Sequence, residues 1–406
     1  MLRFITAGES HGLGLTTIID GLPAGIPITS EYLNSQLKRR RKGFGRGERM
    51  LIESDQGVFT AGIRHGFTLG SPVCIYIENK DHSNWGKIMS PEKECFTTEK
   101  EVTKPRAGHA DLPGMLKYGH NDARNILERA SARETAAKVA AGAICKSMLS
   151  EFGIEIFSYV VSIGNASLNF ELEDMADINI PVNDELKKMI ESSPVSCFND
   201  DTEKKMIAEI EMAKSEGDTL GGTIKLIIIG LPIGLGSHTQ WDRKLDGALA
   251  SAIMSIQAVK AVEIGLGFKA AAMKGSLLHD EIILKNGKIG HKANNAGGIE
   301  GGISNGENIL LKFAMKPIPT LHSPLNTIDM KTGKAAKALV ERSDVCAVPA
   351  AAVVGEAMAA FVIANFLIEK LGGDSMQELK MNFEAMTKAQ NDMLPSVSEG
   401  DQNESK

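Results

Sequence analysis

The chain has 406 residues, of which 43% are hydrophobic and 24% are charged, and this composition is typical of a globular protein with a sizeable core. Its 45 basic and 51 acidic side chains give a net charge of −6, which opposes a general affinity for nucleic acid but allows a local anion site. Five scattered cysteines form no Cys-x-x-Cys pair, and the first residues lack the basic and apolar runs of a signal peptide. We therefore expect reduced thiols, a cytoplasmic location and no metal site.

Short apolar runs bounded by glycine, proline or charged residues predict strands along the chain. The first leads through a glycine-bounded loop into the second, so the chain is expected to begin as strand, loop and strand. The predicted ranges are 2–7, 15–19, 73–77, 157–163, 224–229 and 309–313.

Long helical segments lie between and after these strands. Residues 122–152 stop before Gly153, residues 245–264 stop before Gly265, and residues 350–371 follow Pro349. Residues 345–371 are apolar enough to suggest a membrane span. Because Glu356 lies in the middle of that segment and Ala and Gly are abundant, the sequence favours a buried packing helix.

Strands that alternate irregularly with helices indicate a mixed fold, which we assign to the α+β class. No Pro- or Ser-rich linker divides the chain, so we expect one catalytic domain over residues 1–386 and a polar, flexible tail over 387–406. Gly221-Gly222-Thr223 resembles Gly301-Gly302-Ile303, and both precede an apolar strand. Two short matches do not establish a repeat, but they would fit two related halves.

The strongest local charge is a basic segment at residues 38–49. It begins as Lys38-Arg39-Arg40-Arg41-Lys42, and glycines then alternate with residues that include Arg46 and Arg49. Guanidinium groups bind phosphate and carboxylate oxygens in pairs, and glycines let a backbone approach a ligand closely. The segment predicts a site for a small polyanion. The alternative is a solvated helix end or a nucleic-acid patch, because charge runs are usually surface features.

A second basic group lies in the helix predicted at 122–152. Its members are Arg124, Arg129 and Arg133, of which the last two share a helical face. The surrounding alanines allow close packing, so these guanidinium groups would be partly buried and would need an anion or a carboxylate such as Glu128 or Glu134. Ion pairs within the helix explain the same spacing, and both alternatives stay open.

Two histidines lie in glycine-flanked loops. His11 stands between Ser10 and Gly12, and His109 follows Gly108 close to Arg106. Imidazole exchanges protons near neutral pH, so His109 could protonate a leaving phosphate. A single loop histidine is usually incidental, and the joint occurrence of two favours a catalytic role.

Two later loops carry candidate binding residues. Lys316-Pro317-Ile318-Pro319-Thr320 follows a strand, and its prolines would hold the backbone rigid against a ligand. Arg342-Ser343-Asp344 precedes the last apolar helix. It could bind a phosphate and provide a carboxylate base. The alternatives are a plain rigid loop and an N-cap for the helix.

Gly8-Glu9-Ser10-His11-Gly12 fits the Gly-x-Ser-x-Gly pattern of serine hydrolases. The nucleophile of that class sits between a strand and a helix, whereas Ser10 leads into a predicted strand. The serine hydrolase class is therefore disfavoured. No Gly-x-x-x-x-Gly-Lys-Ser/Thr segment occurs, so a P-loop nucleotidase is unsupported as well.

Taken in order, these motifs resemble the chorismate synthase family over nearly the whole chain. The motifs that carry the resemblance are Gly8 to Gly12, Arg39 to Arg41 with Arg46, Glu128-Arg129-Ala130-Ser131-Ala132-Arg133-Glu134-Thr135, Asn294-Asn295-Ala296-Gly297-Gly298 and Arg342-Ser343-Asp344. The resemblance implies a single-domain β-α-β sandwich in a homotetramer. Gln257, where asparagine is common, and Ala107, where proline is more usual, depart from the family pattern without changing the reaction class.

The resemblance also implies a reaction, that of a carbon-oxygen lyase in the shikimate pathway of aromatic amino acid biosynthesis. Phosphate and a C6 hydrogen leave 5-enolpyruvylshikimate 3-phosphate by anti-1,4-elimination, which gives chorismate. The implied cofactor is reduced FMN with no net redox change, and NADPH is a candidate reductant. A substrate with one phosphate and two carboxylates needs arginine groups for its recognition. No nucleic acid or membrane partner is expected.

By the same resemblance, individual residues take roles. His11 would keep the reduced flavin monoanionic or protonate it, His109 would protonate the departing phosphate, and Asp344 would act through the flavin N5 as it accepts the substrate hydrogen. Substrate anions would be held by Ser10, Arg40, Arg46, Arg49 and Arg133, and Arg40 and Arg46 are also linked to NADP. FMN would be contacted by Arg129, Ala130, Ser131, Gln257, Ala258, Gly301, Lys316, Pro317, Ile318, Pro319, Thr320, Arg342 and Ser343.

Overall fold

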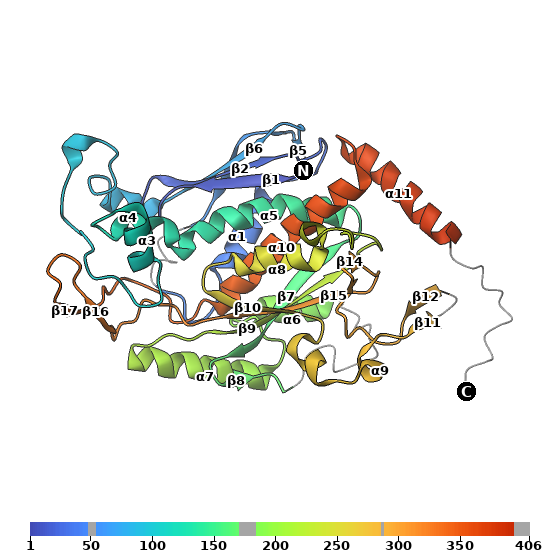
Figure 1. The fold of residues 1–406 in the computed structure, drawn as a ribbon. Coiled ribbons are helices and arrows are strands. Elements are labelled where there is room, and N and C mark those ends of the chain that lie inside the picture. The colour runs from blue at the N-terminus through green and yellow to red at the C-terminus, as the bar shows by residue number, and fades with distance from the viewer. Residues whose placement is uncertain (48–53, 170–183, 286–287, 394–406) are drawn as a thin grey trace.

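The computed structural model describes residues 1–47, 54–169, 184–285 and 288–393. Two antiparallel sheets lie on either side of a layer of long helices, so the chain forms a β-α-β sandwich (Figure 1). In this view the sheet that contains the N-terminal strands lies above the helices and the other sheet lies below them. The predicted α+β class is confirmed.

The first sheet has the strand order β1-β2-β6-β3. These strands are β1 at Arg3–Ala7, β2 at Gly14–Asp20, β6 at Val73–Glu78 and β3 at Gly57–Ala61. In β6, Val73, Ile75 and Ile77 are fully buried, whereas Cys74 and Tyr76 are half-buried. Successive side chains of a strand point to opposite faces, so one face of β6 packs on the helices. The strands predicted at 2–7, 15–19 and 73–77 are confirmed.

The second sheet has the strand order β10-β15-β9-β7-β8. These strands are β10 at Val259–Ile264, β15 at Ile309–Met315, β9 at Gly222–Ile229, β7 at Glu155–Ile163 and β8 at Ala166–Ser167. Strands β7 and β9 are buried over most of their length because helices contact both faces of the sheet. The strands predicted at 157–163, 224–229 and 309–313 are confirmed.

Four helices fill the space between the sheets. They are α1 at Ser30–Arg41, α5 at Thr135–Ser150, α8 at Leu245–Met254 and α10 at Val348–Leu371. Helices α5 and α10 pack closely, because a Cβ atom on Gly142 would lie 2.3 Å from the Cβ atom of Ala357. Helix α10 is long and apolar enough to cross a membrane, yet 78% of its apolar 18-residue window is buried within the protein. It is the buried packing helix that the sequence favoured.

The remaining helices and strands lie around this sandwich. The helices are α3 at Asp111–Tyr118, α4 at Arg124–Ala130, α6 at Asp184–Ser192, α7 at Asp200–Glu216, α9 at Gly275–Leu278 and α11 at Met376–Met393. The short strands are β4 at Ile63–Arg64, β5 at Phe67–Thr68, β11 at Ile282–Lys285, β12 at Lys288–His291, β13 at Ile299–Glu300, β14 at Ile303–Ser304, β16 at Asn326–Ile328 and β17 at Ala335–Lys337.

The two halves of the chain share one topology. The first half has the strand order β1-β2-β6-β3, with α1 between its second and third strands in the chain and α5 after its fourth. The second half repeats this order as β7-β9-β15-β10, with α8 and α10 in the matching places. The structure thus supports two related halves. The similarity between residues 221–223 and 301–303, which suggested two halves from the sequence, does not match equivalent positions of the two halves. Gly222 opens the second strand of its half, whereas Gly301 lies in the β13–β14 turn.

The helix predicted at 122–152 was wrong in its extent, because the chain breaks at Ser131. Helix α4 ends one residue earlier, Ser131 has an extended backbone with φ −59° and ψ 141°, and a 3-10 turn at Ala132–Glu134 leads into α5. The Ser131 hydroxyl accepts a hydrogen bond from the Arg133 backbone N–H at 3.3 Å. A side-chain bond therefore replaces the helical one at this point.

The helix predicted at 245–264 was wrong beyond residue 254. Helix α8 stops at Met254, Ala258 turns the chain with a left-handed φ of +67°, and β10 follows. Gly265 therefore ends a strand. Near the C-terminus, α11 continues past the boundary predicted at residue 386, so residues 387–393 are helical. The rest of the predicted tail lies outside the described residues.

Candidate active site

A cavity of about 850 Å³ opens where the two halves meet at one end of the helical layer. The last turn of α1 and the residues after α8 line it, together with the residues that lead into α5 and α10. This volume falls in the range of ligand-binding pockets, which is about 300–1,000 Å³. Two helix N-termini beside a cavity favour an anionic ligand.

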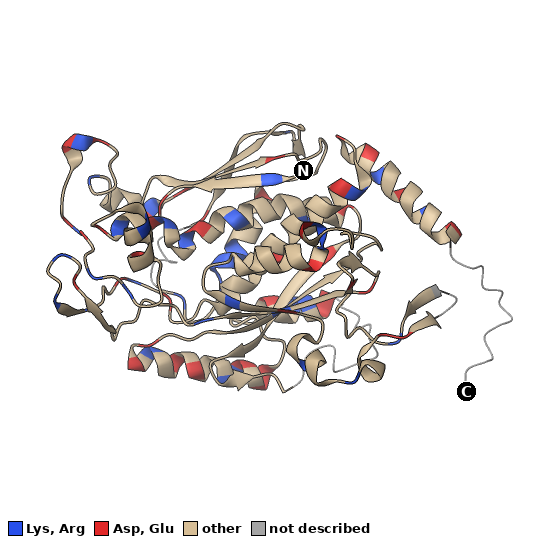
Figure 2. Ribbon diagram, in the orientation of Figure 1, with Lys and Arg blue, Asp and Glu red and all other residues tan. Residues whose placement is uncertain are grey.

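The cavity is strongly basic. Its described lining holds six arginines and three lysines but only three carboxylates, so it carries excess positive charge in a chain that is net negative. Figure 2 shows basic residues gathered around α4 and the start of α5. The arginines are Arg40, Arg46, Arg106, Arg124, Arg133 and Arg342. The fold thus brings together arginines that are spread along the sequence from Arg40 to Arg342.

Most of the predicted site residues meet in this cavity. The residues predicted to be catalytic, His11, His109 and Asp344, all line it. The predicted binding residues that also line it are Ser10, Arg40, Arg46, Ala130, Ser131, Arg133, Gln257, Ala258, Lys316, Ile318, Pro319, Thr320, Arg342 and Ser343.

A few predicted residues are not in the lining. Arg49 lies outside the described residues. Arg129 donates from Nη2 to the backbone carbonyl of Thr6 on β1 at 3.0 Å, and Gly301 lies in the β13–β14 turn. Pro317 is not among the lining residues, although its neighbours Lys316 and Ile318 are. The predicted FMN contacts of Arg129, Gly301 and Pro317 stay predictions.

The three consecutive arginines of α1 have three different partners. Arg39 binds Glu356 on α10, Arg40 binds Asp55, and Arg41 donates to a backbone carbonyl before β3 at 2.9 Å. Successive helical residues point about 100° apart, so neighbours in the sequence face different surroundings. Arg40 is only 3% exposed, which does not fit a solvated nucleic-acid patch.

Asp55 joins two of the cavity arginines. Its Oδ2 accepts a hydrogen bond from Arg40 Nη2 at 2.6 Å, and its Oδ1 accepts one from Arg133 Nη1. Burial alone would raise the pKa of Asp55, but the charges and hydrogen bonds of the two arginines hold that pKa at about 2. Arg133 Nε also donates to Asn79 Oδ1 at 2.9 Å. Both guanidinium groups are therefore fixed in place with one net positive charge between them.

His11 is held by a buried carboxylate. Its Nδ1 lies 2.9 and 3.0 Å from the two oxygens of Glu128, and its backbone N–H donates to the same carboxylate at 2.8 Å. Burial would raise the pKa of Glu128, but its bonds to His11 and the charge of Arg124 lower it. The imidazole stacks on Trp85 with ring centroids 3.9 Å apart. Glu128 and Trp85 thus fix the orientation of the ring, and Nε2 on its other side lies 4.0 Å from Asp81 Oδ2.

His109 has a similar arrangement. Its Nδ1 lies 2.5 Å from Asp111 Oδ1, and Asp111 also accepts hydrogen bonds from the backbone and side chain of Arg106. Burial would raise the pKa of Asp111, but hydrogen bonds from His109 and Arg106 hold it well below its usual range. Arg106 Nη1 donates to Thr320 at 2.8 Å, which ties this loop to the segment after β15. The cavity therefore holds two histidines, each bound at Nδ1 by a buried carboxylate.

Asp344 lies on the wall next to Arg46. Its Oδ1 accepts a hydrogen bond from the Gly47 backbone N–H at 2.7 Å, and its Oδ2 lies 3.2 Å from Arg46 Nε. The neighbouring Ser343 donates to the Thr320 carbonyl at 2.9 Å. The loop at 342–344 thus contributes side chains to the cavity and is more than an N-cap for α10.

The Gly8-to-Gly12 loop does not form a hydrolase elbow. The chain runs from β1 into β2 here, so Ser10 is not on a strand-to-helix turn. Ser10 Oγ donates to Ser131 Oγ at 3.1 Å, which joins the loop to the break after α4. His11 of this loop is positioned by Glu128 and Trp85, and the geometry of the loop does not support a role for Ser10 as a nucleophile.

Sequence reasoning missed several residues that build this site. Asp55, Trp85 and Lys100 had no local motif, and only the fold brings them to the cavity. Lys100 Nζ lies 3.8 Å from the centroid of the Trp85 ring that carries His11. Asp111 could have been found, because it stands two residues after His109.

Fold and site together define a class: an enzyme with a basic cavity suited to a small polyanion, in which two histidines are each bound by a buried carboxylate. Comparison with known proteins is specific. The family model for chorismate synthase matches residues 2–368. Chorismate synthase of Syntrophotalea carbinolica is 52% identical over 384 residues, which cover 95% of this chain and 97% of that protein. Chorismate synthase of Geobacter sulfurreducens is 51% identical over 395 residues, covering 95% and 98%.

A solved structure agrees with these matches. A crystal structure of chorismate synthase superposes with a TM-score of 0.75 at 42% identity and covers 96% of this chain and 98% of its own. The chain belongs to the chorismate synthase family. It is accordingly a lyase of the shikimate pathway that removes phosphate from 5-enolpyruvylshikimate 3-phosphate. The resemblance drawn from the motifs is confirmed.

Proposed function

We propose that the chain forms chorismate by anti-1,4-elimination of phosphate and the C6 hydrogen, with reduced FMN as cofactor and no net redox change. One observation carries the proposal: two carboxylate-bound histidines share a cavity with an excess of arginines. The substrate brings a phosphate and two carboxylates, and its phosphate leaves more readily when it is protonated and its charge is neutralised. The cavity offers both kinds of group.

The cavity residues fit FMN. Gln257 Nε2 donates to Glu134 at 3.0 Å, while its Oε1 is buried and has no hydrogen-bond partner among the residues that the structure describes. Buried acceptors are almost always paired, so this oxygen suits a ring N–H of a bound flavin. Ala258, Lys316, Ile318, Arg342 and Ser343 would complete its surroundings. When bound, reduced FMN supplies an electron to the allylic system as phosphate leaves and regains it as the hydrogen departs.

The arginines bind the substrate anions. Asp55 holds Arg40 and Arg133 in fixed positions, so these donors lose little conformational freedom when the substrate binds. Ser10 and Arg46 add donors from the opposite loops. The substrate contact predicted for Arg49 stays a prediction.

The histidines move protons at Nε2. Because Asp111 occupies Nδ1 of His109, this residue protonates the departing phosphate from its other nitrogen. Glu128 occupies Nδ1 of His11 in the same way, so His11 Nε2 controls the protonation state of the bound cofactor. The carboxylate of Asp344, held by Arg46 and the Gly47 backbone, would act through N5 of the bound flavin as the C6 hydrogen leaves the substrate.

An anaerobic assay tests this function directly. Purified protein is mixed with 5-enolpyruvylshikimate 3-phosphate and chemically reduced FMN, and phosphate and chorismate are measured. We expect equal amounts of both products with reduced FMN and neither product with oxidised FMN. Absence of phosphate release under reducing conditions would reject the proposal.

We further propose a homotetramer. The β11–β12 hairpin leaves Ile282 73% exposed, Leu284 57% exposed and Ile289 42% exposed, and such apolar side chains favour contact with another chain. Light scattering should give four times the chain mass of 43.5 kDa. A mass equal to one chain would reject the tetramer.

Three other assignments complete the proposal. A single catalytic domain, which includes all of α11 and so extends beyond residue 386, is supported by a main core cluster that runs through both halves. A cytoplasmic location is supported by five free cysteines. NADPH as the reductant, with Arg40 and Arg46 as its contacts, is supported by the family resemblance. Oxidation of NADPH by the protein with FMN present tests this last assignment.

A further inference from the structure

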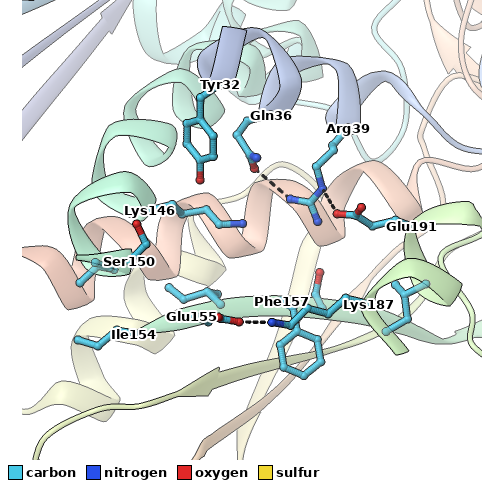
Figure 3. A pocket seen from close by; sticks show the side chains of 14 residues that line it. Tyr32, Gln36, Arg39, Lys146, Ser150, Ile154, Glu155, Phe157, Lys187 and Glu191 are labelled. Atoms are coloured by element: carbon cyan, nitrogen blue, oxygen red, sulfur yellow. Dashed lines mark hydrogen bonds and ion pairs between the residues drawn. The ribbon is translucent and has the colours of Figure 1, made fainter. Parts of the chain in front are cut away.

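A second cavity, of about 250 Å³, lies between α1, α5, β7 and α6 (Figure 3). None of its described lining residues belongs to the lining of the active site. The proposed reaction uses none of its side chains. Its polar groups are nevertheless arranged as in a binding site.

The buried floor of this second cavity is an ion cluster around Glu356 of α10. Arg39 donates to both oxygens of this carboxylate at 2.7 and 3.0 Å, Lys146 Nζ donates at 2.7 Å, and Ser158 Oγ donates at 2.8 Å. Each carboxylate oxygen therefore accepts two hydrogen bonds. Arg39 also lies 3.3 Å from Glu191, so the two cations of this cluster are balanced by two carboxylates.

Two donors on this floor have bonding capacity left. An ammonium group has three N–H bonds, and among the described residues Lys146 Nζ donates only to Glu356. The Tyr32 hydroxyl has no partner among the same residues. Both side chains line the second cavity, and Figure 3 shows the Tyr32 hydroxyl directed toward Lys146. An ammonium and a hydroxyl that line one cavity are suitable donors for one carboxylate.

The walls and the rim restrict what else the ligand can be. The walls are apolar and buried, and they consist of Leu149, Ile154, Ile156, Phe157 and Ile190. The rim carries Glu155, which pairs with Lys187, and Glu191, whose side chain is 56% exposed. An acidic rim, and cations that are each already paired with a carboxylate, disfavour a multiply charged anion.

We propose that the second cavity binds a small monocarboxylate with an apolar body. The carboxylate accepts hydrogen bonds from Lys146 Nζ and the Tyr32 hydroxyl, and the body packs on the aliphatic walls. The volume corresponds to about eight water molecules at roughly 30 Å³ each, which admits a body the size of one benzene ring.

Calorimetric titration with phenylacetate tests the site. We expect saturable binding with one molecule per chain. Tyr32→Phe removes one hydrogen bond and should weaken binding by about 2- to 10-fold. Lys146→Met removes the charged donor and should weaken it by more than about 10-fold. Tyr118→Phe, at a tyrosine that is 63% exposed on α3, is the matched control and should leave binding unchanged.

Binding to the unaltered protein must be compared with binding to the two variants before the ligand is assigned to the second cavity. Undetectable binding to the unaltered protein would overturn the proposal, and so would binding that neither Tyr32→Phe nor Lys146→Met weakens, because the probe would then occupy another place such as the basic active site. Displacement of phenylacetate by an equal concentration of inorganic phosphate would overturn the monocarboxylate assignment. Tyr32→Phe keeps the test decisive if Lys146→Met fails to fold, since it removes only a hydroxyl that no described residue contacts.

Discussion

Replacement of Glu356 by glutamine tests the ion cluster that lies inside α10. Glu356 is 1% exposed and accepts hydrogen bonds from Arg39, Lys146 and Ser158. Glutamine keeps the shape of the side chain but removes its charge. Arg39 and Lys146 would then lose the buried carboxylate that they share, so we expect Glu356→Gln to destabilise the fold.

The loss of stability expected for Glu356→Gln can be estimated in two ways. Burial would raise the pKa of Glu356, but the charges and hydrogen bonds of Arg39 and Lys146 hold it at about 2, against an ordinary value of 4.5. At about 1.4 kcal/mol per pH unit, this difference corresponds to about 3 kcal/mol at neutral pH. Removal of one partner from a buried ion pair costs about 3–5 kcal/mol, which agrees. Burial also lowers the pKa of Lys146, so the net contribution of the whole cluster is smaller than the loss on removal of Glu356.

Equilibrium urea unfolding at a fixed protein concentration measures this loss. Glu191→Gln is the matched control, because Glu191 lies 3.3 Å from Arg39 Nε but is 56% exposed. An exposed ion pair contributes about 0–1 kcal/mol, so the control should change stability by less than Glu356→Gln does. A loss below about 1 kcal/mol in Glu356→Gln, or equal losses in both variants, would refute the reasoning.

The pH dependence provides a second check on Glu356. Its pKa in the folded protein is lower than in the unfolded chain, so its stabilising contribution is complete above pH 4.5 and is lost as the pH falls toward 2. The difference in stability between the unaltered protein and Glu356→Gln should therefore be constant near neutral pH and decrease below pH 4.5. A difference that grows as the pH falls would contradict the assigned sign.

Three further predictions concern the active site. His109→Ala should lower turnover by about 10²-fold or more with the circular dichroism spectrum unchanged. His120→Ala, a control at a half-buried histidine that does not line the cavity, should not. Equal turnover in both variants would remove the acid role of His109. Glu128→Gln should lower kcat by about 10-fold or more with little change in KM, because it acts through His11, and a change confined to KM would show a binding role instead. Gln257→Leu should weaken FMN binding by about 5- to 50-fold in a fluorescence titration, and unaltered affinity would show that its free oxygen does not meet the cofactor.

Local features of the sequence predicted much of the fold. The strand at 73–77 and the helix that ends at Gly372 depend on alternation, helical composition and a terminal glycine, all of which act within a few residues. The same local reasoning overextended the helix at 122–152, because Ser131 and Arg133 are compatible with a helix until tertiary contacts favour the break. The family could be inferred because five separate motifs occur in one order.

The partners of charged residues could not be predicted in this way. Ion pairs within α4 and a site built from its side chains were posed as alternatives, yet Glu128 serves both, since it binds Arg124 four residues before it and His11 in a distant loop. Neither contact excludes the other, because a carboxylate has two oxygens that can each accept more than one hydrogen bond.

The basic run of α1 shows most clearly which features follow from the sequence and which depend on the tertiary structure. Its sequence determined that an anion-binding segment with many guanidinium groups would lie near the start of the chain. Only the tertiary structure decided that Arg40 belongs to the active site and Arg39 to the Glu356 cluster, 317 residues away in the sequence. The physical reason is that helical geometry turns adjacent side chains about 100° apart, and the packing of distant elements then decides which carboxylate each one meets.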